Sequence, residues 1–243
     1  MNLKNLFDNW AREKGEKYQH RQWLLSKWDN LEGVRWSDEK RRLLVQHIQH
    51  HLRAENNDTV LDLGCGGGWM MPEIEPVCAQ VFGCDISWHM LRRSPCPQRV
   101  FVGDAARLPL ADHSLDRVLC YFVLINFQDD AAVEQVLSEI LRILRPGGLA
   151  LLGQLPDRAQ SAQYDQAKAA YLQYCRQEFP AGRDTRDEHY VPVRLYDRGY
   201  WYDLFKRHSV RAQFVEAFNP FYRPGEPRTI PWRFDILVQK PEA

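Results

Sequence analysis

The residues with the clearest chemical potential lie in a glycine-rich turn. Residues 60–68 read Val-Leu-Asp-Leu-Gly-Cys-Gly-Gly-Gly, and alternate positions hold Asp62, Gly64, Gly66 and Gly68. The turn falls where an apolar strand is expected to end and a helix to begin. Glycine allows positive φ angles and close approach of the backbone to a ligand, and the N–H groups of a helix N-terminus attract anions. The segment predicts a site for a dinucleotide or for the amino-acid end of another cofactor.

Two further acids follow expected strands. Asp85 ends Val-Phe-Gly-Cys-Asp, and Asp104 follows a short strand in Val-Gly-Asp-Ala-Ala. A carboxylate at the first of these strand ends can accept hydrogen bonds from both hydroxyls of a ribose. Either acid alone would be interpreted as a helix cap or a solvated loop residue. Together, and after this glycine turn, they predict a nucleoside-binding edge.

The dinucleotide fingerprint Gly-x-Gly-x-x-Gly would need glycine at position 69, where Trp69 stands. A nicotinamide oxidoreductase is therefore disfavoured. The complete Asp-x-Gly-x-Gly-x-Gly pattern instead resembles motif I of the class I S-adenosylmethionine-dependent methyltransferases. The strand Leu-Asp-Arg-Val-Leu-Cys-Tyr-Phe-Val-Leu and the segment Leu-Arg-Pro-Gly-Gly-Leu-Ala-Leu-Leu are similar to later motifs of that family. The resemblance covers residues 58–154 in order.

This resemblance implies an enzyme that uses S-adenosylmethionine and releases S-adenosylhomocysteine. It implies that Ile86 lies against adenine, that Asp104 accepts a bond from the adenine amino group, and that Ala105 contributes its backbone N–H. The full set of cofactor-binding residues implied is Asp62, Gly64, Cys65, Gly66, Gly68, Asp85, Ile86, Asp104, Ala105, Cys120 and Tyr121. Many relatives carry a histidine soon after the fourth strand, whereas this chain has Ile125-Asn126-Phe127, so no general base is carried over.

The elements that must position these residues alternate between strand and helix. Strands are expected at 58–63, 80–84, 99–103, 115–123, 148–154, 211–218 and 233–239. Helices are expected at 69–78, 87–93, 130–144, 160–178 and 196–208. In the helix at 130–144 the apolar residues recur at helical spacing, an aspartate at 129 or 130 can cap its start, and Pro146-Gly147-Gly148 stops it.

We therefore predict an α/β protein with a doubly wound, Rossmann-like, seven-stranded and mostly parallel sheet. The last two strands have no helix between them, which favours an antiparallel strand at the sheet edge. Four regions are expected: an N-terminal helical lid at 1–54, a cofactor-binding core at 55–155, an insertion over the active site at 156–195, and a C-terminal helix and hairpin at 196–243 that complete the same domain.

Composition narrows the class of protein. The 243 residues include 32 basic and 32 acidic residues, so the net charge of zero gives no general attraction to nucleic acid or anionic membrane. No stretch predicts a membrane span, and the start lacks an apolar signal core, so we expect a cytoplasmic protein. The six cysteines form no Cys-x-x-Cys pair and are expected to be reduced core thiols. His47 and His51 are four apart on a helix, but without a third ligand we expect a solvated face and no metal.

Methyl transfer to a nucleophile requires alignment and exclusion of water, and a base only for some acceptors. The candidate bases are His189, Tyr190 and His113, of which the first two lie in the expected insertion. Trp10, Trp23, Trp28 and Trp36 lie in the expected lid, and we predict that at least one faces the active-site cleft. Arginines of the C-terminal half are interpreted as mixed surface charge. The alternative is that a few of them bind an anionic or carboxylate-bearing acceptor.

The function expected is methylation of a small-molecule or saccharide-like acceptor, on oxygen more than on nitrogen. An RNA methyltransferase and a non-catalytic S-adenosylmethionine-binding scaffold for a partner are the alternatives. The first is disfavoured by zero net charge and the absence of an Asn-Pro-Pro-Tyr stretch, and the second by the intact turn and acids. The sequence identifies neither the acceptor, the atom methylated nor the oligomeric state.

Overall fold

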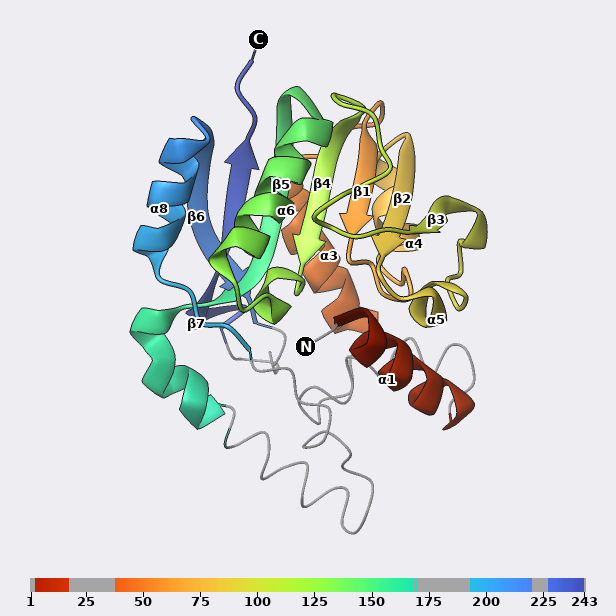
Figure 1. Cartoon of the computed structure of the whole chain (residues 1–243), viewed down its shortest axis with the longest axis horizontal. Helices are drawn as coiled ribbons and strands as arrows, with labels where there is room; N and C mark the ends of the chain where they lie inside the picture. The colour runs from red at the N-terminus through yellow and green to blue at the C-terminus, as the bar shows by residue number, and fades with distance from the viewer. Residues whose placement is uncertain (1–2, 18–37, 168, 170–192, 220–226, 243) are drawn as a thin grey trace.

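A computed structural model describes residues 3–17, 38–167, 169, 193–219 and 227–242. In this part of the chain one seven-stranded sheet forms the centre of the molecule, with strand order β3-β2-β1-β4-β5-β7-β6 (Figure 1). The strands are β1 (Thr59–Leu63), β2 (Gln80–Asp85), β3 (Val100–Val102), β4 (Leu115–Tyr121), β5 (Leu144–Pro156), β6 (Arg211–Phe218) and β7 (Thr229–Gln239). The expected Rossmann-like α/β sheet is confirmed.

Strand directions also follow the expectation. Parallel pairing joins β3, β2, β1, β4 and β5. The reversed strand is β7, which lies between β5 and β6 and is antiparallel to both. The antiparallel hairpin at the sheet edge is therefore confirmed, and its second strand is the inner one. The apolar run from Phe234 to Val238 explains that order, because these residues are buried and need cover on both faces.

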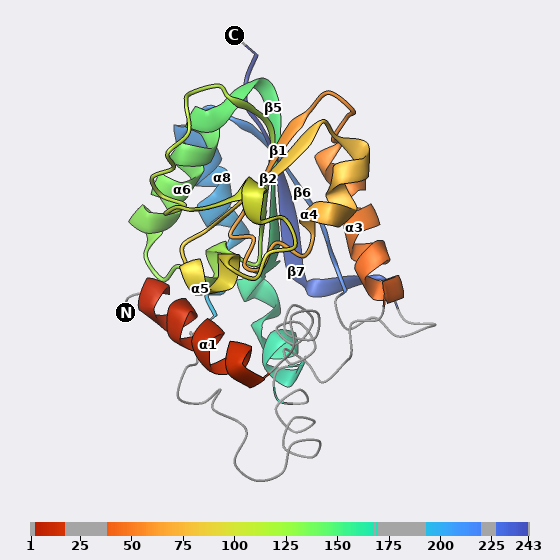
Figure 2. The ribbon, with the colours of Figure 1, turned by 90° about the vertical axis from the view of Figure 1, so that its right-hand side faces the viewer.

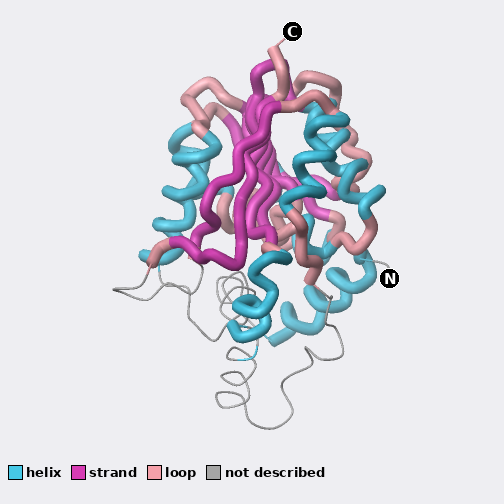
Figure 3. The backbone as a smooth tube through the Cα atoms, turned by 90° about the vertical axis from the view of Figure 1, so that its left-hand side faces the viewer, coloured by secondary structure: helices cyan, strands magenta, loops and turns pink. Residues whose placement is uncertain are grey.

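Helices cover both faces of the sheet (Figure 2). One face is packed by α6 (Asp130–Ile143) and α8 (Arg198–Arg207), and the other by α3 (Asp38–Leu52) and α4 (Met71–Ile74). Two more helices are α1 (Leu3–Lys17) and α5 (Trp88–Leu91). They contact each other at the end of the sheet that lies away from the C-terminus of the chain. Residues 161–167 are also helical. The tube in Figure 3 shows the strands enclosed between these helical layers.

The helix α6 follows its sequence closely. The Asp129 side chain accepts a hydrogen bond from the Ala131 N–H, which caps the helix start. Its apolar stripe is buried against the sheet and consists of Val133, Val136, Leu137, Ile140 and Ile143. The helix ends at Ile143, and β5 begins directly at Leu144 rather than at 148. The strand can run through the Pro-Gly-Gly segment because the Gly147 N–H, at φ 76°, donates to the Lys240 carbonyl.

Two other boundaries differ from expectation. The helix expected at 69–78 is the four-residue α4 followed by a 3-10 turn at Glu75–Val77, because Pro76 interrupts the α-helical hydrogen bonds. The strand β7 begins at Thr229, four residues before the expected start at 233. Pro231 is tolerated there because regular pairing with β6 is broken between Ile230 and Phe234, and pairing with β5 starts only at Arg233.

The helix α3 belongs to the core, although residues 1–54 were expected to form a lid. Leu44, Val45, Ile48 and Leu52 are buried in the cluster that covers β1, β4 and β5. The expected solvated histidine face is wrong for His47, whose side chain is only 14% exposed. His47 Nε2 lies 3.2 Å from Oδ2 of the fully buried Asp235 on β7.

Asp235 is the centre of a buried polar cluster. Its carboxylate accepts bonds from the Tyr121 hydroxyl at 2.8 Å and from the Gln154 N–H at 2.6 Å, and it contacts His47. We call His47, Tyr121, Gln154 and Asp235 the Asp235 cluster. A buried carboxylate is tolerated only when hydrogen bonds replace its water. Burial and the Asp235 charge raise the pKa of Tyr121 well above its usual value, so the phenol stays protonated and donates.

The cysteines outside the undescribed segments are free and buried, as expected: Cys65, Cys78, Cys84, Cys96 and Cys120. Cys175 lies outside the described residues. The helices that the structure describes include none with both the length and the apolar character needed to cross a membrane.

Gly153 gives a direct test of this packing. A Cβ at Gly153 would lie 1.8 Å from Cε2 of the buried Tyr121 ring, so Gly153→Ala must displace a ring held by Asp235. We expect the free energy of unfolding to fall by about 3 kcal/mol, at the upper end of ordinary overpacking costs. Urea denaturation measures this change.

Gly147→Ala is the matched control. Its Cβ would meet nothing closer than 3.7 Å, but its φ of 76° penalises a side chain. We expect a loss of about 1 kcal/mol there. If Gly153→Ala is no more destabilising than Gly147→Ala, the Tyr121 ring is not held as described.

Candidate functional site

The glycine turn follows β1 and needs glycine for conformation and for space. Gly64, Gly66 and Gly68 have φ angles of 76°, 57° and 69°. A Cβ at Gly64 would lie 2.3 Å from Val123 Cγ2, and one at Gly68 would lie 2.8 Å from Ser94 Oγ. Glycine is thus required at positions 64 and 68 for both conformation and space.

The turn is tied to β2 by backbone and side-chain bonds. The N–H groups of Gly64 and Cys65 both donate to the Cys84 carbonyl, at 2.7 and 3.0 Å. Asp85 Oδ2 accepts the Gly66 N–H at 2.8 Å, and Oδ1 accepts the Ser87 N–H at 2.9 Å. Each carboxylate oxygen has two lone pairs, so one that accepts an N–H can also accept a second donor. Asp85 therefore shapes the turn, and its predicted role as acceptor for a ribose stays a prediction.

Acidic residues gather around the end of β2. Burial raises the pKa of the Cys84 thiol to about 12, and the charges of Asp85, Asp104 and Asp62 add to the shift. These three carboxylates are therefore close enough to act on one sulfur atom. Asp62 itself is buried, whereas Asp104 is exposed and accepts the Ala106 N–H at 2.9 Å. Such a field favours a cationic ligand.

The other implied cofactor residues fall into two groups. Ile86 and Ala105 are half-buried beside these acids, where the resemblance places adenine. Cys120 and Tyr121 are buried instead, in the core and in the Asp235 cluster respectively. Burial, with a contribution from Asp62, raises the pKa of Cys120. The Cys120 side chain packs in the core, so a direct role of this residue would fall to its backbone.

The helix α1 lies at the carboxyl end of the parallel strands, beside α5 (Figures 1 and 2). Asp8 on α1 accepts bonds from the Ser87 hydroxyl and, at 3.4 Å, from the His89 N–H. Ser87 is also the residue whose N–H contacts Asp85. The first part of the expected lid thus borders the acidic edge.

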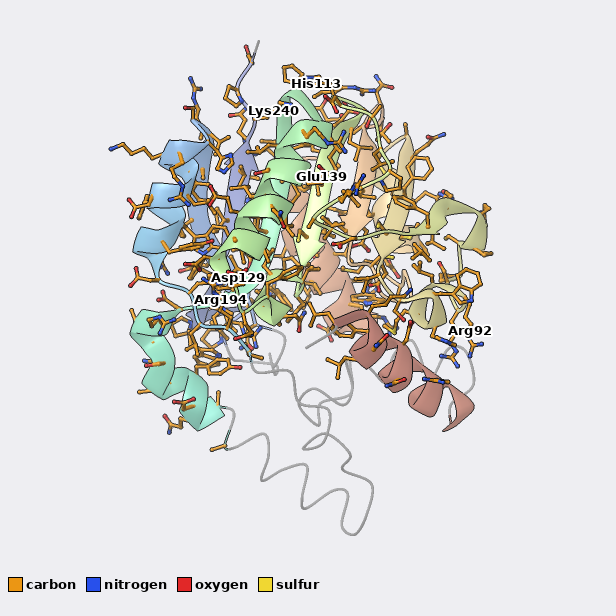
Figure 4. The ribbon with its side chains drawn as sticks, in the orientation of Figure 1. Arg92, His113, Asp129, Glu139, Arg194 and Lys240 are labelled. Carbon is orange, nitrogen blue, oxygen red and sulfur yellow. The ribbon has the colours of Figure 1, made fainter. Side chains whose placement is uncertain are left out.

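The candidate base His113 lies at the opposite edge of the sheet. It precedes β4, whereas the glycine turn follows the carboxyl end of β1, and its Nδ1 lies 3.2 Å from the Leu144 carbonyl and 2.9 Å from Lys240 Nζ (Figure 4). We therefore do not propose His113 as a base. The described residues do not include His189, Tyr190, Trp23, Trp28 or Trp36. The predictions about these residues and about the Trp10 side chain therefore stay predictions.

Among the arginines of the C-terminal half, sequence reasoning did not single out Arg233, which lies at the carboxyl edge. Arg233 Nη1 donates to the Gln154 carbonyl at 3.2 Å, and its guanidinium carbon lies 5.7 and 5.8 Å from the ring centroids of Phe122 and Tyr164. The available signal was Asp235, a single acid within the apolar run Phe-Asp-Ile-Leu-Val. Acids in such runs need buried partners.

Comparisons with known proteins agree with this geometry. Residues 61–152 match the methyltransferase domain family. The methyltransferase GfsG of Streptomyces halstedii is 30% identical over 166 residues, covering 59% of this chain and 58% of its own. The demethylmenaquinone methyltransferase of Beutenbergia cavernae is 40% identical over 100 residues, covering 40% of each. The chain thus spans only about half the length of these relatives.

A solved structure extends the similarity of fold to nearly the whole chain. A chain from the complex of the Haloferax volcanii Trm112 methyltransferase activator superposes with a TM-score of 0.62, at 16% identity and 98% coverage of both chains. Residues 61–152 are thus similar in sequence to a methyltransferase domain, and the fold is shared with solved S-adenosylmethionine-dependent methyltransferases. The cofactor of such domains is S-adenosylmethionine, whose cationic sulfonium suits the acidic edge and whose amino-acid end suits the backbone N–H groups of the glycine turn.

Asp85→Ala tests the nucleoside end of this site. Removing the carboxylate removes the acceptor of the Gly66 N–H and of the ribose hydroxyls, and bonds to a charged acceptor contribute about 1.5–3 kcal/mol each. We expect the dissociation constant of S-adenosylhomocysteine to rise about tenfold or more in calorimetry.

Asp203→Ala, an exposed change on α8, is the matched control and should leave that constant unchanged. Equal affinities in the two variants would remove Asp85 from the site.

Proposed function

We propose that this protein transfers the methyl group of S-adenosylmethionine to a small-molecule or saccharide-like acceptor, with oxygen favoured over nitrogen. The observation that carries the proposal is the turn of positive-φ glycines tied by Asp85 to a cluster of acids at the carboxyl edge. The name of the demethylmenaquinone relative supports a small-molecule acceptor. The buried free thiols support a reducing compartment, and we propose the cytoplasm.

The chain's own residues would act mainly by positioning. Bound S-adenosylmethionine would supply an electrophilic methyl group. The glycine turn and Asp85 would fix the position of the cofactor and hence of its methyl group. The carboxyl ends of β4 and β5 would hold the acceptor on the other side of that methyl group. In-line alignment and exclusion of water lower the barrier to such a displacement. A base is needed only for a hydroxyl acceptor, and His189 and Tyr190 remain our candidates for it.

Two alternatives are distinguishable. They are an RNA acceptor and a non-catalytic role beside a partner subunit. The structural neighbour from a complex with a methyltransferase activator bears on the second alone, and only through its fold. Zero net charge continues to disfavour RNA. Affinity for RNA that falls steeply with salt would favour the RNA acceptor instead. Tight cofactor binding without transfer to any acceptor would favour the scaffold.

Transfer from methyl-labelled S-adenosylmethionine to a panel of metabolites and sugars tests the proposal directly. We expect label in a small organic product with the native chain. Asp85→Ala at the same cofactor concentration should lose about tenfold or more of the rate because it binds the cofactor weakly.

Asp203→Ala serves again as the control and should retain the full rate. Binding of NADH in place of S-adenosylhomocysteine would contradict the whole assignment.

A further inference from the structure

We propose that Arg233 binds a carboxylate of the acceptor, so that the acceptor is a carboxylate-bearing small molecule. This inference rests on the proposed function and names the substrate class of the same site. The first observation is where Arg233 lies. Val123 packs over the glycine turn at Gly64, and the preceding residue, Phe122, lies under the Arg233 guanidinium. Arg233 is thereby placed beside the cofactor turn, on the side of β4 that faces β5 and β7.

Arg233 makes no ion pair with a described residue, whereas seven other described arginines do. The described arginines with a carboxylate within ion-pair distance are Arg99, Arg117, Arg142, Arg145, Arg194, Arg198 and Arg207. No described carboxylate lies within that distance of Arg233, although its side chain is half-buried. Its Nε is shielded from solvent and has no hydrogen-bond partner. A donor in that condition is costly unless a ligand group meets it.

The donors of Arg233 that Gln154 does not take have the geometry of a carboxylate site. Gln154 takes Nη1, which leaves the edge formed by Nε and Nη2. Those two N–H groups point the same way and match the two oxygens of a carboxylate. The rings of Phe122 and Tyr164, each within 6 Å of the guanidinium carbon, hold the plane of the group. A single cation beside the negative Asp235 suits a monoanion better than a phosphate dianion, so we assign a carboxylate.

The surrounding backbone is arranged to hold Arg233 in place. Gln154 and Phe122 have φ angles of 63° and 60°, which residues other than glycine rarely adopt. Gln154 is held there by its N–H bond to Asp235 and by its side-chain bond to the Phe218 carbonyl at 2.8 Å. Its own carbonyl then receives Arg233. Strained residues that persist at adjacent strand ends are characteristic of sites built for a ligand.

The experiment compares matched acids and amides. The full-length chain saturated with S-adenosylhomocysteine is titrated with acetate and phenylacetate, and with acetamide and phenylacetamide, by calorimetry or ligand-observed NMR. We expect at least one acid to bind about tenfold or more tightly than its amide. Arg233→Gln should remove this preference, and Arg233→Lys should keep part of it because charge survives without the planar pair of donors.

Arg145→Gln, which changes an ion-paired arginine at the opposite edge of the sheet, is the control and should behave as the native chain. All variants should bind S-adenosylhomocysteine alike, so loss of that binding in the native chain would contradict the proposed function and not this inference. Equal binding of acid and amide, no binding of either, or a preference that survives Arg233→Gln would overturn it. If Arg233→Gln does not fold, the native comparison and Arg233→Lys decide.

Discussion

One buried carboxylate constrains the arrangement of the sheet's carboxyl edge. Asp235 cannot be left without partners in an apolar interior, and the partners it has come from α3, β4 and β5. The ring of Tyr121 is thereby pressed against Gly153, and the backbone of Gln154 is held in a left-handed conformation. The position of Arg233 depends on that backbone in turn. A polar interaction inside the core therefore sets the geometry of the surface where an acceptor would bind.

The two halves of the site are built by different means. On the proposed cofactor side the backbone itself would be the binding surface. Asp85 holds the turn through the Gly66 and Ser87 N–H groups and would also accept bonds from the ligand. On the other side, aromatic rings and one cation provide the surface, and strained residues support it. The first half is suited to one invariant ligand, and the second can change its specificity through a few side chains.

Much of the cofactor side could be predicted because its signals are local. Strand-helix alternation, the glycine pattern and Asp85 lie close together in sequence, and the structure has the predicted sheet. The Asp235 cluster could not be predicted in the same way, because His47 and Asp235 are 188 residues apart and their contact depends on how α3 packs. The periodicity that identified α3 as a helix did not say which of its faces is covered. For that reason His47 was expected to be exposed to solvent. His113 was considered as a base because its sequence position did not show that it lies at the end of β4 away from the glycine turn.

The contact of Asp8 with Ser87 has a consequence for the order of events. Because Ser87 also contacts Asp85, the docking of α1 and the loading of the nucleoside share one short segment of backbone. Two processes that stabilise the same conformation of a segment favour each other, and by equal amounts. If the nucleoside binds at Asp85 as proposed, its binding would strengthen the attachment of the N-terminal helix, and the acceptor would then meet that helix in place only after the cofactor has bound.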